Sequence, residues 1–314
     1  MAKSFGSSSP LQPMNVGSIV SAAFQLYRSH LKQYLSITWR ATLWIFLALL
    51  CVMGPIVLLI LSSAFEAALI GLIVLLIPVG IVLMVICSAR AGMNTALISR
   101  LAYGELIQQP ESVQAGRQDM RPRMWRLFWA QVFVNLLLWL INVGLTIVQS
   151  VFAGLAAVAL GSESVIAGLI TVIVYLVTLG IYLWFSARWA IPELPIAIEN
   201  VSSSQAVTRS WDLSEGSAMR VLTVLFVALL VTLPLYILSF LPFFSTLITL
   251  APQLAADSNV ARISLVVSLG ISTLLFLLLN IFIIPFWQAL KALIYYDLRN
   301  RREGLDLQLR QRPD

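Results

Sequence analysis

Three blocks of the chain are almost free of charged residues, and together they make up more than half of it. They span residues 41–89, 127–187 and 221–290. The only charges in these blocks stand near their middles: Glu66, Glu163, and the pair Asp257 and Arg262. A membrane-spanning helix needs about 20 mainly apolar residues, so each block can hold two such helices with a charged turn between them. The pattern therefore predicts three helical hairpins.

The six predicted membrane-spanning segments contain no charged residue, because an ionised side chain at the bilayer centre costs at least ~2.5 kcal/mol. They are 41–63, 69–88, 127–152, 165–186, 221–241 and 263–288. The blocks lack the short alternating segments that are typical of a β-barrel. The predicted fold class is an all-α, polytopic membrane protein with six transmembrane helices.

Short matches between the blocks suggest a threefold internal repeat of the hairpin. The second segment ends in Ser88–Ala89–Arg90, and the fourth ends in Ser186–Ala187–Arg188. In the repeat interpretation, each hairpin is preceded by a segment that lies at the membrane surface.

An amphipathic helix is predicted before the first block. Apolar residues recur at helical spacing from Val16 to Leu35, with serines and basic residues on the opposite face. A helix over 16–38 would either lie in the cytoplasmic interface or pack against the ends of the spanning helices. The only histidine, His30, lies on its flank and is expected to face solvent or lipid headgroups.

Four further segments complete the predicted organisation. A second interfacial helix is predicted over 203–215, capped by a serine and ended by Gly216. Residues 242–256 are expected to form a short interfacial or re-entrant element. Residues 1–15 are expected to be a disordered cytoplasmic tail, and residues 305–314 a second cytoplasmic tail.

Composition and charge add an orientation to this picture. Hydrophobic residues make up 60% of the chain and charged residues only 11%, against about 25% in a soluble domain. In the hairpin arrangement, 19 of the 20 lysines and arginines lie on one side of the membrane, and only Arg262 lies on the other. The positive-inside rule makes that side the cytoplasm and places both termini there. The net charge of +6 is then explained by attraction to anionic headgroups, and no nucleic-acid partner is expected.

The spanning segments offer one polar constellation. Gln131, Asn135, Asn142 and Gln149 share a face of the third segment, and Asn280 lies in the sixth. This polar stripe could form a solute path. The alternative is hydrogen bonding between helices, which contributes about 0.6 kcal/mol per bond and needs no substrate.

A second candidate site lies on the predicted cytoplasmic side. Glu193 and Glu199 could pair with Arg188 or Arg209 and fix the helix ends there, or they could contribute to binding. The full candidate cytoplasmic cluster comprises Arg188, Glu193, Glu199, Arg209, Trp211, Tyr295, Tyr296, Asp297 and Arg299.

Two stretches of this cluster resemble a known family. They are Ile191–Leu213, with IPELPIAIENV followed by AVTRSWDL, and Tyr295–Leu307, with YYDLRNRREGLDL. The chain resembles the bacterial multi-pass family named for the membrane domain of glycerophosphodiester phosphodiesterases, and related inner-membrane proteins. The resemblance implies a six-helix membrane domain in a bacterial inner membrane, with Trp211, Tyr295, Tyr296, Asp297 and Arg299 at its recognisable positions. It implies no catalytic residues, because the family's hydrolase is a separate soluble domain that this chain lacks.

The sequence thus favours a non-enzymatic membrane module that binds lipid or a protein partner at its cytoplasmic face. Membrane lipids with anionic headgroups, another membrane protein or a second copy of the chain are the expected partners. No catalytic residue, metal ligand or cofactor motif is predicted. The alternative is a transporter or lipid-handling carrier that uses the polar stripe, and an enzyme acting on lipid headgroups is a third hypothesis.

Overall fold

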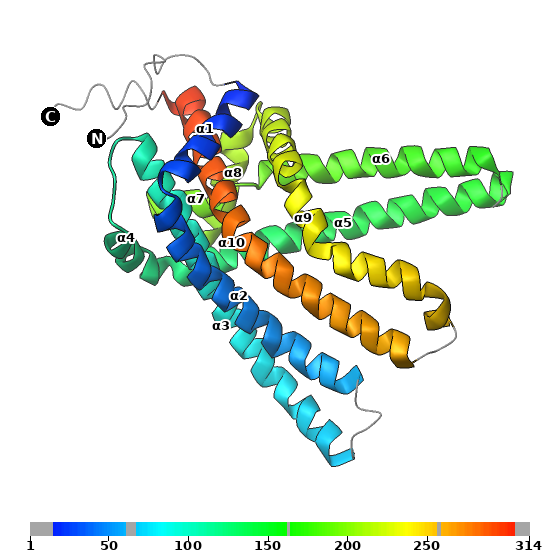
Figure 1. Ribbon diagram of the computed structural model, residues 1–314. Coiled ribbons are helices and arrows are strands. Elements are labelled where there is room, and N and C mark those ends of the chain that lie inside the picture. The colour runs from blue at the N-terminus through cyan, green and yellow to red at the C-terminus, as the bar shows by residue number, and fades with distance from the viewer. Residues whose placement is uncertain (1–14, 61–66, 162–163, 256–258, 305–314) are drawn as a thin grey trace.

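The computed structural model describes residues 15–60, 67–161, 164–255 and 259–304, and these residues are almost entirely helical (Figure 1). The predicted tail 1–15 lies outside them except for Asn15, and the tail 305–314 lies wholly outside. The elements are α1 (Val16–Ser29), α2 (Leu31–Ile60), α3 (Ala67–Leu106), α4 (Val113–Met120), the 3-10 helix η2 (Arg121–Arg123), α5 (Met124–Leu160), α6 (Val165–Arg188), α7 (Glu193–Glu199), α8 (Ser203–Ser214), α9 (Ala218–Ala255) and α10 (Asn259–Glu303).

Six of the helices in the described ranges are long and apolar enough to cross a membrane. This confirms the predicted all-α class with six candidate spans. Neighbouring helices along the chain lie side by side in pairs: α2 with α3, α5 with α6, and α9 with α10 (Figure 1). The threefold repeat stays a prediction.

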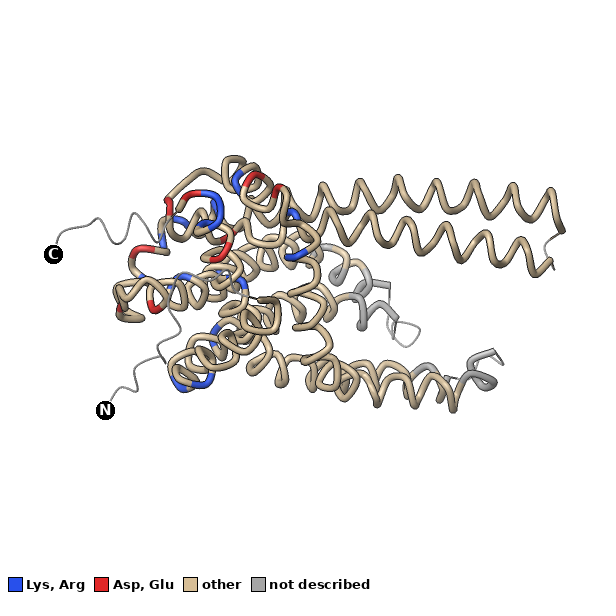
Figure 2. The backbone as a smooth tube through the Cα atoms, turned by 90° about the horizontal axis from the view of Figure 1, so that it is seen from above, with Lys and Arg blue, Asp and Glu red and all other residues tan. Residues whose placement is uncertain are grey.

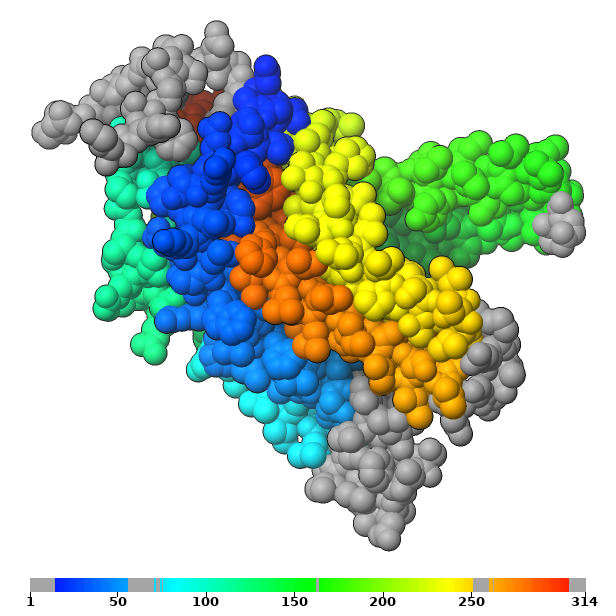
Figure 3. Space-filling view, viewed as in Figure 1, coloured from blue at the N-terminus to red at the C-terminus, as the bar shows by residue number. Residues whose placement is uncertain are grey.

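The helix pairs diverge from a common end of the molecule, which we call the base. The base consists of α1, α4, η2, α7, α8 and the ends of the long helices that pack against them. Figure 2 shows the acidic and basic residues gathered there. Figure 3 shows the α5–α6 pair projecting separately from the α9–α10 pair. The molecule therefore has a polar base and apolar projecting helices.

The base has a packed core of its own. Its largest fully buried side chains include Ile19, Leu26, Leu97, Leu194 and Tyr295. These residues come from α1, α3, α7 and α10, which are far apart in the sequence. Along the projecting pairs, by contrast, large apolar side chains are exposed, as expected for helices that face lipid chains.

Two long helices connect the projecting part to the base. With 40 residues, α3 is about 60 Å long, and the 45 residues of α10 make it about 68 Å long. The hydrocarbon core of a bilayer is about 30 Å thick, so each helix can cross it and continue into the base.

The first predicted helix, 16–38, is instead two. The chain turns at His30, where α1 ends, and α2 begins at Leu31 and continues into the apolar segment. The turn contains neither glycine nor proline, and the apolar periodicity continues across it. The sequence pattern therefore gave no sign of the turn. Of the two predicted arrangements, the second is found: α1 packs against α9 and α10 and buries Ile19, Ala23 and Leu26.

The predicted interfacial or re-entrant element 242–256 is not separate from the fifth spanning helix over residues 242–255, and residue 256 lies outside the described residues. Helix α9 continues through Pro242 to Ala255, alongside α10. The backbone N–H of Phe243 donates a hydrogen bond to Oγ of the fully buried Ser272 on α10, at 3.1 Å. Because a membrane offers no water to a free backbone group, this contact helps the helix to continue past the proline.

The α2 and α3 helices approach closely at one glycine. A Cβ atom on Gly80 would collide with the backbone carbonyl oxygen of Cys51. Small residues at such points let helix backbones pack tightly in membranes.

Candidate functional site: the charged base

The carboxylate of Glu199 is the centre of an ion-pair network in the base. It accepts hydrogen bonds from Arg209 of α8, whose Nε lies 3.1 Å from Oε2, and from the hydroxyl of Tyr295 on α10. Arg299 pairs with Glu303 at 2.8 Å, and Glu303 also contacts Arg209. Burial lowers the pKa of Arg209, but the carboxylates of Glu199 and Glu303 outweigh burial and raise it above its usual value. The network joins α7, α8 and α10.

The other carboxylates of the candidate cytoplasmic cluster are also paired. Glu193 lies 2.6 Å from Nζ of Lys291. Asp297, which is only 5% exposed, lies 3.2 Å from Nε of Arg220 and 3.0 Å from Nε of Arg301. These pairs hold α10 against α7 and α9, so the carboxylates have structural partners in this arrangement.

Arg188 lies among aromatic rings. Its guanidinium carbon lies 3.9 Å from the centre of the Trp211 ring and 5.5 Å from that of Trp184. Its backbone carbonyl accepts hydrogen bonds from two serine hydroxyls of α8. The predicted pairing of Arg188 with Glu193 or Glu199 is therefore wrong, because the Arg188 side chain is turned toward α8 instead. The cation–π contact ties the end of α6 to α8.

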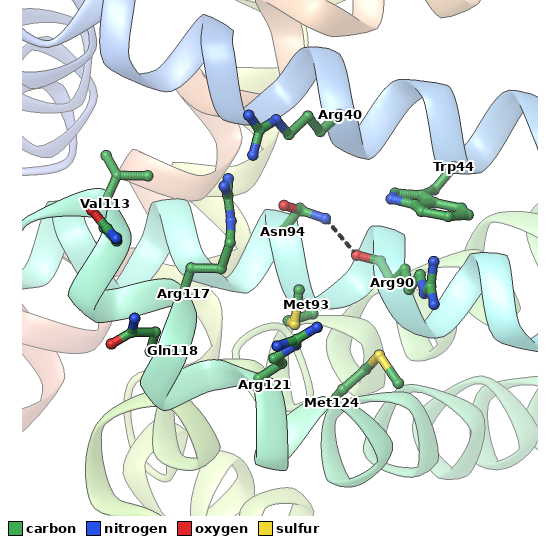
Figure 4. A pocket seen from close by; sticks show the side chains of 11 residues that line it. Arg40, Trp44, Arg90, Met93, Asn94, Val113, Arg117, Gln118, Arg121 and Met124 are labelled. Carbon is green, nitrogen blue, oxygen red and sulfur yellow. Dashed lines mark hydrogen bonds between the residues drawn. The ribbon is translucent and has the colours of Figure 1, made fainter.

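A cavity of about 740 Å³ lies in the base, lined by residues of α2, α3, α4, η2 and α5. We call it the arginine cavity, because four arginines line it: Arg40, Arg90, Arg117 and Arg121. No aspartate or glutamate is among its described lining residues. Figure 4 shows the guanidinium groups of Arg40 and Arg117 turned toward each other.

The charges around α4 are segregated to two sides of the helix. Glu111 and Asp119 both pair with Arg100 of α3, and Asp119 also pairs with Arg123 at 2.9 Å. The acidic side chains near α4 therefore have basic partners outside the cavity. Arg117 faces the cavity instead, where burial and then the positive charge of Arg40 lower its pKa.

From the sequence, these four arginines were expected to lie on the cytoplasmic side, and no binding site was predicted for them. A stronger signal was present, because Arg40 and Arg90 are the two residues that flank the first charge-poor block. An antiparallel helix pair brings both ends of such a block to the same membrane surface. The sequence contained no comparable indication that α4 would contribute Arg117 to the cavity.

The five amides of the polar stripe are divided between two helix pairs. Three of them lie exposed on α5: Gln131, Asn135 and Asn142. Gln149 donates a hydrogen bond to the hydroxyl of Thr178 on α6. Asn280 lies on α10 and donates to the backbone carbonyl of Phe276 in its own helix, at 2.7 Å. Two of the five thus act as internal hydrogen-bond donors.

His30 is partly exposed, and it also has a protein partner on α3. Its Nε2 lies 3.3 Å from Oε1 of Glu105 near the end of α3, and Ser29 lies 2.9 Å from Nδ1. This contact fixes the turn between α1 and α2 against α3.

Within the part of the chain that the structure describes, no three His, Cys, Asp or Glu residues are grouped so that they could hold a metal ion. Comparisons with protein-family models, with curated proteins and with solved structures find no match to this chain.

Proposed function

We propose that this protein is a non-enzymatic module of a bacterial cytoplasmic membrane that binds anionic lipid with its base. The observation that carries the proposal is the arginine cavity, in which several positive charges meet without an acidic partner in its lining. Anionic headgroups attract basic residues near the membrane surface by about 1 kcal/mol each. The paired state of Glu193, Glu199 and Asp297 favours binding over acid–base catalysis in the base.

The test is to purify the full chain in a mild, uncharged detergent and to identify everything that remains bound by mass spectrometry. Anionic phospholipid should be enriched over its fraction in the host membrane. A zwitterionic-only lipid content would contradict the proposal, whereas a tightly bound protein would favour the partner-binding alternative.

The proposal also requires the base to face the cytoplasm. In a version whose Cys51 and Cys87 are replaced by alanine, a membrane-impermeant thiol reagent should label Ser204→Cys from the cytoplasmic side. The same reagent should label Val165→Cys, at the opposite end of α6, from the other side. Both positions are exposed, so reversed labelling would overturn the orientation.

A carrier is the second candidate function, and the exposed amides of α5 favour it. Gln131, Asn135 and Asn142 have polar groups on a helix pair that projects by itself (Figure 3). Polar side chains inside the membrane need hydrogen-bond partners. Either a solute or a second helix could supply these partners to the amides of α5.

A further inference from the structure

The arginine cavity lies where the charge-poor parts of α2 and α3 end. Arg40 and Arg90 stand at the ends of the charge-poor block 41–89, which forms the apolar parts of α2 and α3. The Trp44 ring, one turn further along α2, lies 4.4 Å from the guanidinium carbon of Arg90. Tryptophan and arginine in this arrangement are typical of the boundary between headgroups and acyl chains.

The charges in the cavity differ from those elsewhere in the base. Arg100, Arg123, Arg209 and Arg299 each lie within 3.1 Å of a carboxylate oxygen. Among the described residues that line the cavity there is no carboxylate to pair with Arg40, Arg117 or Arg121. Arg117 is half-buried, and Arg40, Arg90 and Arg121 are exposed. Like charges that lie close together repel each other, and an anion between them removes the repulsion.

The chemistry of the lining narrows the class of anion. A guanidinium group presents two parallel N–H donors that match the oxygens of a phosphate. Arg40 and Arg117 are turned toward each other and could contact one phosphate from two sides, whereas Arg90 lies against the Trp44 ring (Figure 4). The volume of about 740 Å³ is in the range of sites for whole small molecules, so there is room for more than the phosphate alone. Trp44, Met93 and Met124 supply an apolar wall.

We infer that the arginine cavity binds the phosphate group of an anionic molecule at the membrane surface, with Arg40 and Arg117 as its contacts and Arg90 and Arg121 as further positive charges of the lining. This inference deepens the proposed function and rests on it, because it assigns the lipid-binding role to one site. A lipid headgroup and a soluble phosphate compound share this chemistry, and the experiment separates them.

The first measurement is the thermal unfolding midpoint of the delipidated full chain in an uncharged detergent. Dioctanoyl phosphatidic acid at tenfold excess over its Kd should raise the midpoint by roughly 3 °C. Dioctanoyl phosphatidylcholine, whose headgroup is neutral overall, should have little effect. Stabilisation by phosphatidic acid alone indicates a lipid ligand, and equal stabilisation by inorganic phosphate indicates that the phosphate group suffices.

The second measurement uses variants that remove two positive charges. Arg117→Gln with Arg121→Gln should weaken phosphatidic acid binding by at least about tenfold, because it removes one contact of the phosphate and one further positive charge. The matched control, Arg126→Gln with Arg302→Gln, removes two exposed arginines of the base that do not line the cavity. It should bind as the wild type does. Without ligand, the cavity variant should be at least as stable as the wild type, because repulsion with Arg40 is relieved.

The inference is overturned if neither phosphate nor phosphatidic acid stabilises the wild type, or if the cavity variant and its control respond equally. Mass spectrometry of the lipid bound to the purified protein then tests the proposed function separately. If the cavity variant retains the anionic lipid of the wild type, the base binds lipid at another site and only the inference fails. If the wild type carries no anionic lipid, the proposed function fails as well.

Discussion

Replacing Trp211 with alanine should destabilise the protein by about 3–5 kcal/mol, the usual cost of removing a packed tryptophan. Its ring lies 5.3 Å from that of Trp189 and 5.6 Å from that of Trp184. Alanine would also leave Arg188, which is only 5% exposed, without the ring that contacts its guanidinium. The midpoint of thermal unfolding in detergent measures the loss.

Two variants serve as controls for this result. Trp211→Phe keeps an aromatic face beneath Arg188 and should cost clearly less than Trp211→Ala. Trp125→Ala removes a tryptophan that is 45% exposed and contacts the Phe128 ring, so its effect should be small. Equal losses for Trp211→Phe and Trp211→Ala would contradict a role for the cation–π contact.

Replacing Glu199 with alanine should destabilise the base by about 3 kcal/mol. The variant leaves Arg209 and Arg299 to share the single carboxylate of Glu303 and removes the acceptor of the buried Tyr295 hydroxyl. Removing one member of a mostly buried ion pair is costly because the remaining charge stays desolvated. The same thermal measurement applies, and α7 should become more accessible to protease.

Glu215→Ala is the matched control for Glu199→Ala. Glu215 also pairs with an arginine, Arg302, at 3.0 Å, but its side chain is 66% exposed. An exposed pair contributes about 1 kcal/mol or less. If both variants lost the same stability, the network around Glu199 would not hold the base together.

The parts of the fold that depend on local sequence could be predicted. Six apolar segments follow from hydropathy alone, and the cap of α8 follows from Ser202, whose side chain forms a capping box with Gln205. The pairing of Glu199 with Arg209 was also predicted from the sequence, in which only ten residues separate them.

Two prolines, Pro192 and Pro195, lie at the start of α7 without breaking the helix. In the structure Pro192 is the N-cap of α7 and Pro195 lies in its first turn. A helix leaves the N–H groups of its first turn unpaired, so a proline there costs no hydrogen bond.

Contacts between distant segments could not be predicted. Lys291 and Glu193 are 98 residues apart, and the arginine cavity combines residues of α2, α3, α4, η2 and α5. Hydrophobic periodicity shows which face of a helix is buried, but it does not identify the helix that covers it.

The core of the base has a consequence for biosynthesis, because it combines the first and last helices of the chain. Ile19 and Leu26 of α1 are buried in a cluster that includes Leu293 and Tyr295 of α10. The ribosome synthesises α1 long before α10. The apolar face of α1 therefore lacks its α10 partner while the intervening helices are being synthesised and inserted into the membrane. A chain that ends before α10 would keep this face exposed, and cellular proteases and chaperones recognise such surfaces. The core of the base is therefore completed only when α10 has been synthesised.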